Sequence, residues 1–262
     1  MALALAASAC GDDSHTDTGD RPARPAGGEV VVQVAQEGGL LPPEVAVATV
    51  PSVTVLGDGT VITPAPVPEI YPGPAIPPLQ SVGVDGGVVD NLVAEASRLG
   101  LLAGTLDFGQ PPVMDAPVTT VTIAARGTTH RHVAPALFEA EEPASGVTEQ
   151  QVANRRALRS FVEETRGLPP GEQPWVPPAI AVYGLGPYHP DPELPQEQLA
   201  WPLRRAPTTS GSRPCTLYQG DEAAALLAAL AGASARTPWI VEGTPQSLGF
   251  RPVVPGQPGC PS

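Results

Sequence analysis

Hydrophobic and polar residues alternate in the first third of the chain, which predicts strands there. The run EVVVQVAQ from Glu29 alternates and is rich in valine, as a first strand would be. Pro42 and Pro43 then break the pattern. In PSVTVLGDGTVITP, two β-branched runs flank Gly-Asp-Gly at 57–59, which is a short-range hairpin signal. The proline-rich stretch 64–78 follows; because proline cannot pair inside a sheet, we expect an extended surface loop.

Three later segments have the period of an amphipathic helix. The stretch 84–100 repeats apolar residues at helical spacing and ends at a glycine. Thr148 and Gln151 have the spacing of a capping box, which predicts a second helix that ends at Gly167. Asp221 is the expected cap of a third, alanine-rich helix.

Hairpins are expected after the first and third helices, one around Arg126-Gly127-Thr128 and one in TPWIVEGTPQSLGFRPVV. IAVYGLG and LAWPL are shorter strand candidates. We therefore expect an α+β fold with mostly antiparallel sheets and about three helices. Hairpin, proline-rich loop, helix and hairpin occur in 51–137 and, less clearly, in 179–254. A duplicated ββαββ unit is one interpretation, and coincidence is the other.

Composition narrows the possible chemistry. The chain has 14 basic residues, all of them arginine, and a formal net charge of −13. Without lysine there is no Schiff-base lysine and no P-loop lysine. The negative charge argues against nucleic acid as a partner. GxSxG, HExxH, SxxK and glycine-rich phosphate loops are absent from the sequence. We therefore expect no nucleotide, no cofactor and no enzymatic activity.

The beginning of the chain has the pattern of a processing segment. The apolar run MALALAASA ends directly before Cys10, and the acidic stretch GDDSHTDTGD follows. Ala7-Ser8-Ala9-Cys10 resembles the end of a bacterial lipoprotein signal peptide, although this family usually has leucine where Ala7 stands and a basic region upstream. The resemblance implies a diacylglycerol on Cys10 that holds the protein on the outer face of the cytoplasmic membrane. The alternative is an ordinary terminus with a chance cysteine.

The whole chain resembles the uncharacterised lipoproteins of high-GC Gram-positive, actinobacterial bacteria. The resemblance rests on the Cys10 motif, the glycine hairpin at 57–59, YPGP at 71–74 and FRPVVP near the carboxyl end. It implies no particular activity.

The remaining cysteines, Cys215 and Cys260, form a pair. An exported protein meets an oxidising environment, so a disulfide between them is expected; the alternative is two free thiols in a cytosolic protein. No Cys/His cluster with zinc-ligand spacing is present.

These observations divide the chain into five parts. Residues 1–10 are the expected signal segment and 11–28 a disordered tether. Residues 29–146 are a first α+β unit, 147–168 a connecting helix, and 169–262 a second α+β unit with the proline-rich loops and the disulfide.

Two groups of residues are candidates for a site. His130 and His132 share one face of a strand and could bind a metal ion, although two ligands do not make a site. We expect instead a half-exposed pair on a solvated sheet face, and no metal. The proline-rich stretches carry aromatic residues that rigid loops could display for recognition, or that fill gaps in the core: Tyr71, Trp175, Tyr183, Tyr188 and Trp201.

The function expected from the sequence is that of a non-catalytic binding or scaffold lipoprotein at the cell envelope. Its partners would be the membrane lipid through Cys10 and an envelope protein or glycan. The alternatives are a cell-envelope hydrolase with an unrecognised active site and a metal-binding lipoprotein that uses His130 and His132.

Overall fold

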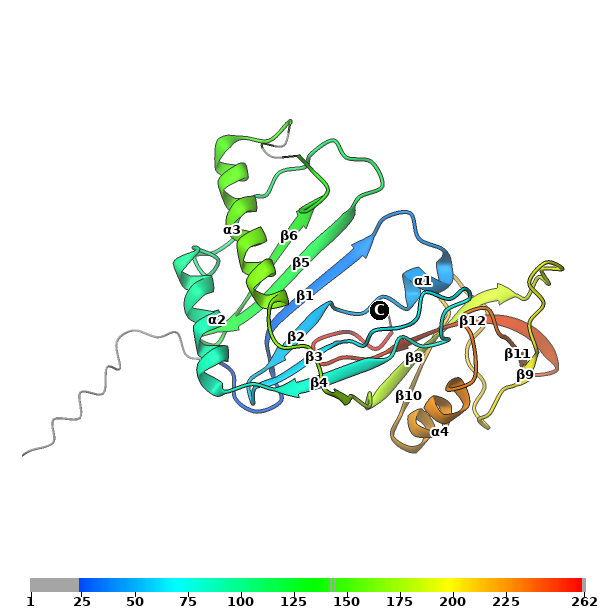
Figure 1. The fold of residues 1–262 in the computed structure, drawn as a ribbon. Coiled ribbons are helices and arrows are strands. Elements are labelled where there is room, and N and C mark those ends of the chain that lie inside the picture. The colour runs from blue at the N-terminus through cyan, green and yellow to red at the C-terminus, as the bar shows by residue number, and fades with distance from the viewer. Residues whose placement is uncertain (1–23, 142, 144, 261–262) are drawn as a thin grey trace, which may run out of the picture.

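The computed structural model describes residues 24–141, 143 and 145–260. Cys10, the signal segment and most of the expected tether lie outside the described residues. The fold is α+β, as predicted, with two mostly antiparallel sheets side by side (Figure 1). No helix among the described residues combines the length and apolar character that crossing a membrane requires.

The larger sheet has its first strand in the middle. Its order is β6-β5-β1-β2-β3-β4-β7, and every neighbouring pair is antiparallel. Helices α2 (Gly86–Arg98) and α3 (Glu149–Arg166) cover one face (Figure 1). The strands are β1 (Val30–Gly38), β2 (Val53–Leu56), β3 (Thr60–Pro64), β4 (Leu79–Gly83), β5 (Pro117–Ala125), β6 (Thr128–Pro135) and β7 (Gln173–Pro174).

The smaller sheet has the order β10-β8-β12-β11-β9, with only β11 and β9 parallel. Helix α4 (Gly220–Leu230) packs on one face through Leu226 and Leu230. The strands are β8 (Ala179–Pro187), β9 (Leu199–Ala200), β10 (Cys215–Gln219), β11 (Pro238–Val241) and β12 (Thr244–Pro252). Cys215 and Cys260 form the expected pair, with their Sγ atoms 2.07 Å apart.

All three predicted helices are present, and a predicted capping box correctly located the start of one of them, α3. Asp85 caps α2 by accepting a hydrogen bond from the Gly87 N–H at 2.7 Å. The Thr148 and Gln151 capping box is confirmed. The third prediction was wrong in detail, because α4 has Gln219 as its N-cap residue and Asp221 lies in the first turn.

A short helix, α1 (Pro43–Val47), occupies the position where the sequence analysis expected only a break. Proline fits the first turn of a helix because the N–H groups there have no intrahelical acceptor. Helix α1 follows β1 of the larger sheet in the chain, but it packs on β12 of the smaller sheet.

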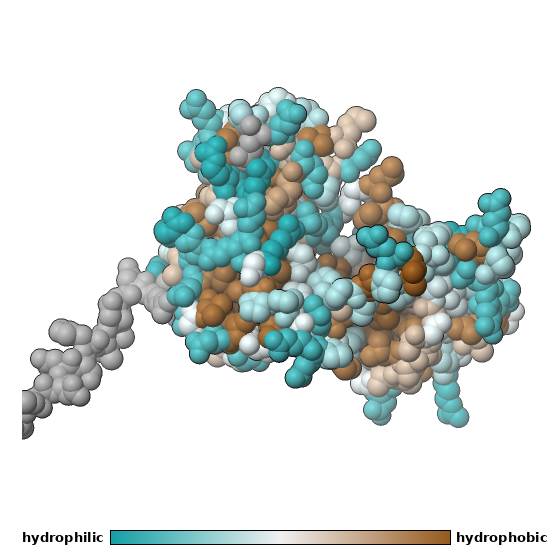
Figure 2. Space-filling model, viewed as in Figure 1, coloured by the Kyte–Doolittle hydropathy of each residue, from teal (hydrophilic) through white to brown (hydrophobic). Residues whose placement is uncertain are grey.

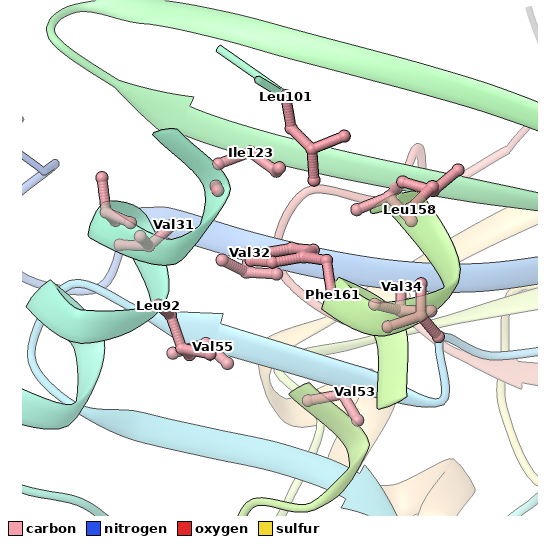
Figure 3. Close-up of a cluster of buried hydrophobic side chains, with 14 of the residues drawn as sticks. Val31, Val32, Val34, Val53, Val55, Leu92, Leu101, Ile123, Leu158 and Phe161 are labelled. Atoms are coloured by element: carbon pink, nitrogen blue, oxygen red, sulfur yellow. The ribbon is translucent and has the colours of Figure 1, made fainter. Parts of the chain in front are cut away.

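The main core lies between the larger sheet and its two helices. Figure 3 shows side chains of β1, β2 and β5 directed toward α2 and α3. A bulge at the start of β1 lets Val31 and Val32 both join this core. On the opposite face, the Gln33 side-chain amide donates to the Pro255 carbonyl at 2.8 Å. The carboxyl-terminal segment therefore covers the back of β1.

The strand orders do not support a duplicated ββαββ unit. After α2, the hairpin joins the larger sheet through its first strand, β5, which pairs with β1. After α4, the hairpin joins the smaller sheet through its second strand, β12, which pairs with β8. The strand of the hairpin that joins the sheet is thus the first one in one half and the second one in the other, which a duplicated unit would not show.

The domain begins earlier than the expected tether boundary at residue 28. Arg24 forms an ion pair with Asp90 at 2.7 Å, and the Asp58 N–H donates to the Gly27 carbonyl at 2.7 Å. A side chain at position 57 would place its Cβ 2.3 Å from the Pro25 carbonyl oxygen. Residues 24–28 therefore pack on the β2–β3 hairpin, and glycine at position 57 permits the contact.

Candidate functional site

An apolar groove of about 370 Å³ lies between α1, the proline-rich stretch 64–78 and the loop after α4. Figure 2 shows hydrophobic surface at and around the position of α1. Several apolar side chains here are unusually open to solvent, including Val45 (45% exposed), Val67 (48%) and Tyr71 (71%). Because isolated domains seldom keep such a patch without a use, the groove is the leading candidate site. Its lining is Pro42, Glu44, Val45, Ala48, Thr49, Val50, Pro64, Ala65, Val67, Tyr71, Gly73, Pro74, Ala75, Pro77, Pro78, Ala235 and Arg236.

Backbone hydrogen bonds hold the walls of the apolar groove in place. The Ala65 N–H donates to the Pro78 carbonyl at 2.9 Å and closes the base of the proline-rich stretch. The Ala75 N–H donates to the Ala233 carbonyl at 3.0 Å. The Ala235 N–H donates back to the Gly73 carbonyl at 2.9 Å, so the stretch is fastened to the loop after α4.

Helix α1 is seated closely on β12. A side chain at position 249 would place its Cβ 2.3 Å from the Val47 Cγ2 atom, so only glycine allows this packing. Since α1 is seated on β12 and the proline-rich stretch is bonded to the loop after α4, both walls are held by contacts within the protein, which limits the ordering cost of binding.

A polar hollow of about 230 Å³ continues from the apolar groove and shares Glu44, Ala235 and Arg236 with it. Tyr188, His189, Thr237 and Ser247 contribute its polar groups. A ligand that spans the two hollows would therefore meet apolar walls at one end and hydrogen-bonding groups at the other.

Arg236 stands at the junction of the two hollows. Its Nη1 donates to the Tyr71 hydroxyl at 3.1 Å, and its Nη2 lies 3.9 Å from Asp191 Oδ2. The hydrogen bond to Tyr71 raises the pKa of Arg236, and the charges of Glu44 and Asp191 act in the same direction. The guanidinium thus remains a cation beside the apolar wall.

The structure distributes the five aromatic candidates between surface and core. Tyr71 lines the apolar groove and Tyr188 the polar hollow. Trp175 packs with a small core of Leu56, Ile62, Leu79 and Val254.

Trp201 and Tyr183 lie outside the groove as well. The Trp201 Nε1–H donates to the Arg205 carbonyl at 2.9 Å, and its ring lies against Tyr218 and Trp239. Tyr183, on β8, is half-buried beside the Arg251 guanidinium, next to a separate hollow on the far side of α1.

The expectation of a solvated histidine pair is wrong for His132, which is only 1% exposed. Its Nε2 lies 2.8 Å from the Leu101 carbonyl oxygen, and its ring meets Phe108 edge-on. The shared face of His130 and His132 is the face that α2 and α3 cover, where the sequence pattern alone did not show burial. Among the described residues, no three His, Cys, Asp or Glu side chains are grouped to bind a metal.

His132 should make the stability of the protein fall in acid. Burial lowers the pKa of its imidazole below the ordinary value of 6.5, so the folded state takes up the proton only at a lower pH than the unfolded chain does. The unfolded chain takes up the proton near pH 6.5. The free energy of unfolding therefore keeps its full value above that pH and decreases as the pH falls below it, by up to about 1.4 kcal/mol per pH unit. Urea unfolding of wild type and His132→Gln between pH 7.5 and 5 measures this.

The His132→Gln variant should lose less stability over this range than wild type. Exposed His189 offers the matched control, since His189→Gln should retain the wild-type pH profile. Equal pH profiles for wild type and His132→Gln would contradict the assignment.

Sequence reasoning missed Glu44, Val45, Ala48 and Arg236. A signal was present for the first three, because a proline followed by glutamate is typical of a helix start. No local pattern marks Arg236, whose role depends on a contact with Tyr71, 165 residues away in sequence.

Comparisons with known protein families, with curated proteins and with solved structures find no match for the chain.

Proposed function

We propose that the chain is a non-catalytic binding lipoprotein of the cell envelope, anchored through Cys10, that holds an envelope component in the apolar groove. The observation that carries the proposal is the groove itself, with fixed, exposed apolar walls and one cation at its end. Pockets that combine apolar lining with a few placed polar groups are the usual sites for small ligands and peptide segments.

The position of the groove suits a tethered protein. Residues 24–28 pack on the β2–β3 hairpin at the start of β1, whereas α1 follows the end of β1 (Figure 1). Nine residues of strand at about 3.3 Å each separate these two places by roughly 30 Å. A chain that enters from an anchor near residue 24 would leave the groove accessible at the far end of the domain.

The disulfide supports an extracytoplasmic location for the proposed lipoprotein. Cys215 and Cys260 are within bonding distance, and such pairs persist mainly where the environment is oxidising.

Substituting Cys10 by serine tests the anchor. In the native host, the wild-type protein should sediment with the membranes, whereas Cys10→Ser should appear in soluble or secreted fractions because it lacks the acceptor thiol. A His15→Ser control, five residues further along the chain, should keep its membrane association. Retention of Cys10→Ser in the membrane fraction would rule out lipidation as the anchor.

A photo-crosslinking residue in place of Val67 tests the groove in intact cells. We expect a discrete adduct from position 67, which mass spectrometry would identify as protein, glycan or lipid. The same probe at Met114, a highly exposed apolar residue outside the groove, serves as the control. Equal labelling from both positions would overturn the assignment of the groove as the binding surface.

A further inference from the structure

We propose that the apolar groove binds the hydrocarbon tail of a long-chain fatty acid and that Arg236 and Tyr71 bind its carboxylate. The inference rests on the proposed function, since it takes the groove as the binding site, and it names the class of ligand.

The walls of the groove suit a hydrocarbon better than a peptide. Five lining residues are prolines, which have no N–H: Pro42, Pro64, Pro74, Pro77 and Pro78. The N–H groups of the lining residues Ala65, Ala75 and Ala235 are already bonded to carbonyls of the protein. A peptide laid in the groove would bury amide groups with few partners, whereas an alkyl chain requires none.

The end of the groove offers two donors to one anion. Arg236 is the only arginine among the described residues that lines either hollow. Its Nη2 lies 3.9 Å from Asp191 Oδ2, which is beyond hydrogen-bond distance. Nη2 can therefore donate a hydrogen bond to an acceptor that lies closer. The Tyr71 oxygen accepts from Arg236 Nη1 at 3.1 Å, which leaves the hydroxyl proton to donate. A carboxylate placed here would receive a hydrogen bond from each side chain.

The surrounding charges select against a doubly charged headgroup. Glu44 lines both hollows, and Asp191 faces Arg236 from the loop after β8. These two carboxylates outnumber the one guanidinium, so a doubly charged phosphate would meet more repulsion than a singly charged carboxylate, which the two direct hydrogen bonds must hold.

A membrane surface is a poorer candidate for the occupant of the groove. The chain carries a net charge of −13, which opposes adhesion to anionic lipid. The tether from a membrane anchor would enter the domain near residue 24, at the start of β1. The groove lies near the other end of this strand. A single lipid molecule extracted into the groove avoids both difficulties.

Binding of radiolabelled palmitate by the full chain with Cys10→Ser tests the proposal, because this variant carries no covalent lipid. We expect saturable binding of one palmitate per chain. Arg236→Gln should weaken it at least tenfold and Tyr71→Phe severalfold, with unchanged melting temperatures. Arg204→Gln, at an exposed site outside the groove, is the matched control and should bind as tightly as its parent.

1-Hexadecanol separates the tail from the headgroup, because it has the same chain length without a carboxylate. Its binding should be insensitive to Arg236→Gln. Absence of saturable palmitate binding, or equal effects of Arg236→Gln on palmitate and hexadecanol, would overturn the proposal. If palmitate fails to bind while position 67 still crosslinks specifically, only the fatty-acid assignment is lost; if the crosslink also fails, the proposed function is lost with it.

Discussion

Replacing Cys215 by alanine should lower the free energy of unfolding by about 4 kcal/mol, because the disulfide closes a loop of 45 residues. The cross-link restricts the unfolded chain, and the restriction grows with the length of the loop. In the folded state it joins β10 to the carboxyl-terminal tail. That tail is held further by Arg251, whose Nη2 donates to the Pro258 and Gly259 carbonyls at 2.8 and 2.9 Å.

Urea unfolding monitored by tryptophan fluorescence measures the effect. Reduced wild type, Cys215→Ala and the double variant Cys215→Ala/Cys260→Ala should share one lowered midpoint, since each lacks the same cross-link. Cys10→Ala should keep the wild-type midpoint. A Cys215→Ala midpoint within error of oxidised wild type would show that the cross-link contributes nothing.

Arg155→Met should be about as damaging, with an expected loss of about 3–5 kcal/mol. Arg155 lies on α3 and is only 2% exposed. Its guanidinium donates to the Phe108 and Pro135 carbonyls at 3.2 and 3.0 Å, and also to the Ala136 carbonyl. Methionine fills a similar volume but donates no hydrogen bond, so these buried acceptors would lose their partner.

Arg156→Met is the matched control, because Arg156 is the next residue of the same helix and is exposed. It should change the free energy of unfolding by no more than about 1 kcal/mol, because solvent weakens the interactions of an exposed arginine. Equal losses in the two variants would mean that burial of the Arg155 donors has no special importance.

The elements that sequence reasoning predicted correctly depend on neighbouring residues. Gly57 and Gly59 flank the tight turn between β2 and β3, and the Thr148 capping box determines where α3 begins. Such signals act over a few residues, so they can be read without knowing the fold.

The candidate site could not be predicted in this way, because its parts come together only in the folded chain. Helix α1, the stretch 64–78 and Arg236 belong to three separate regions of the sequence. The burial of His132 has the same cause: α2 and α3 decide which face of β6 is covered, and a strand's own alternation does not reveal this.

The segment behind β1 also limits when the fold can be completed. Gln33 near the beginning of the domain bonds to Pro255 near its end, a separation of 222 residues. A nascent chain can pair β1 with β2 early, but the back of that strand stays uncovered until the segment around Pro255 has been made. Contacts of such long range slow folding. Dividing the gene after α3 would therefore leave the back of β1 exposed, and co-expression of the missing part would be needed to cover it.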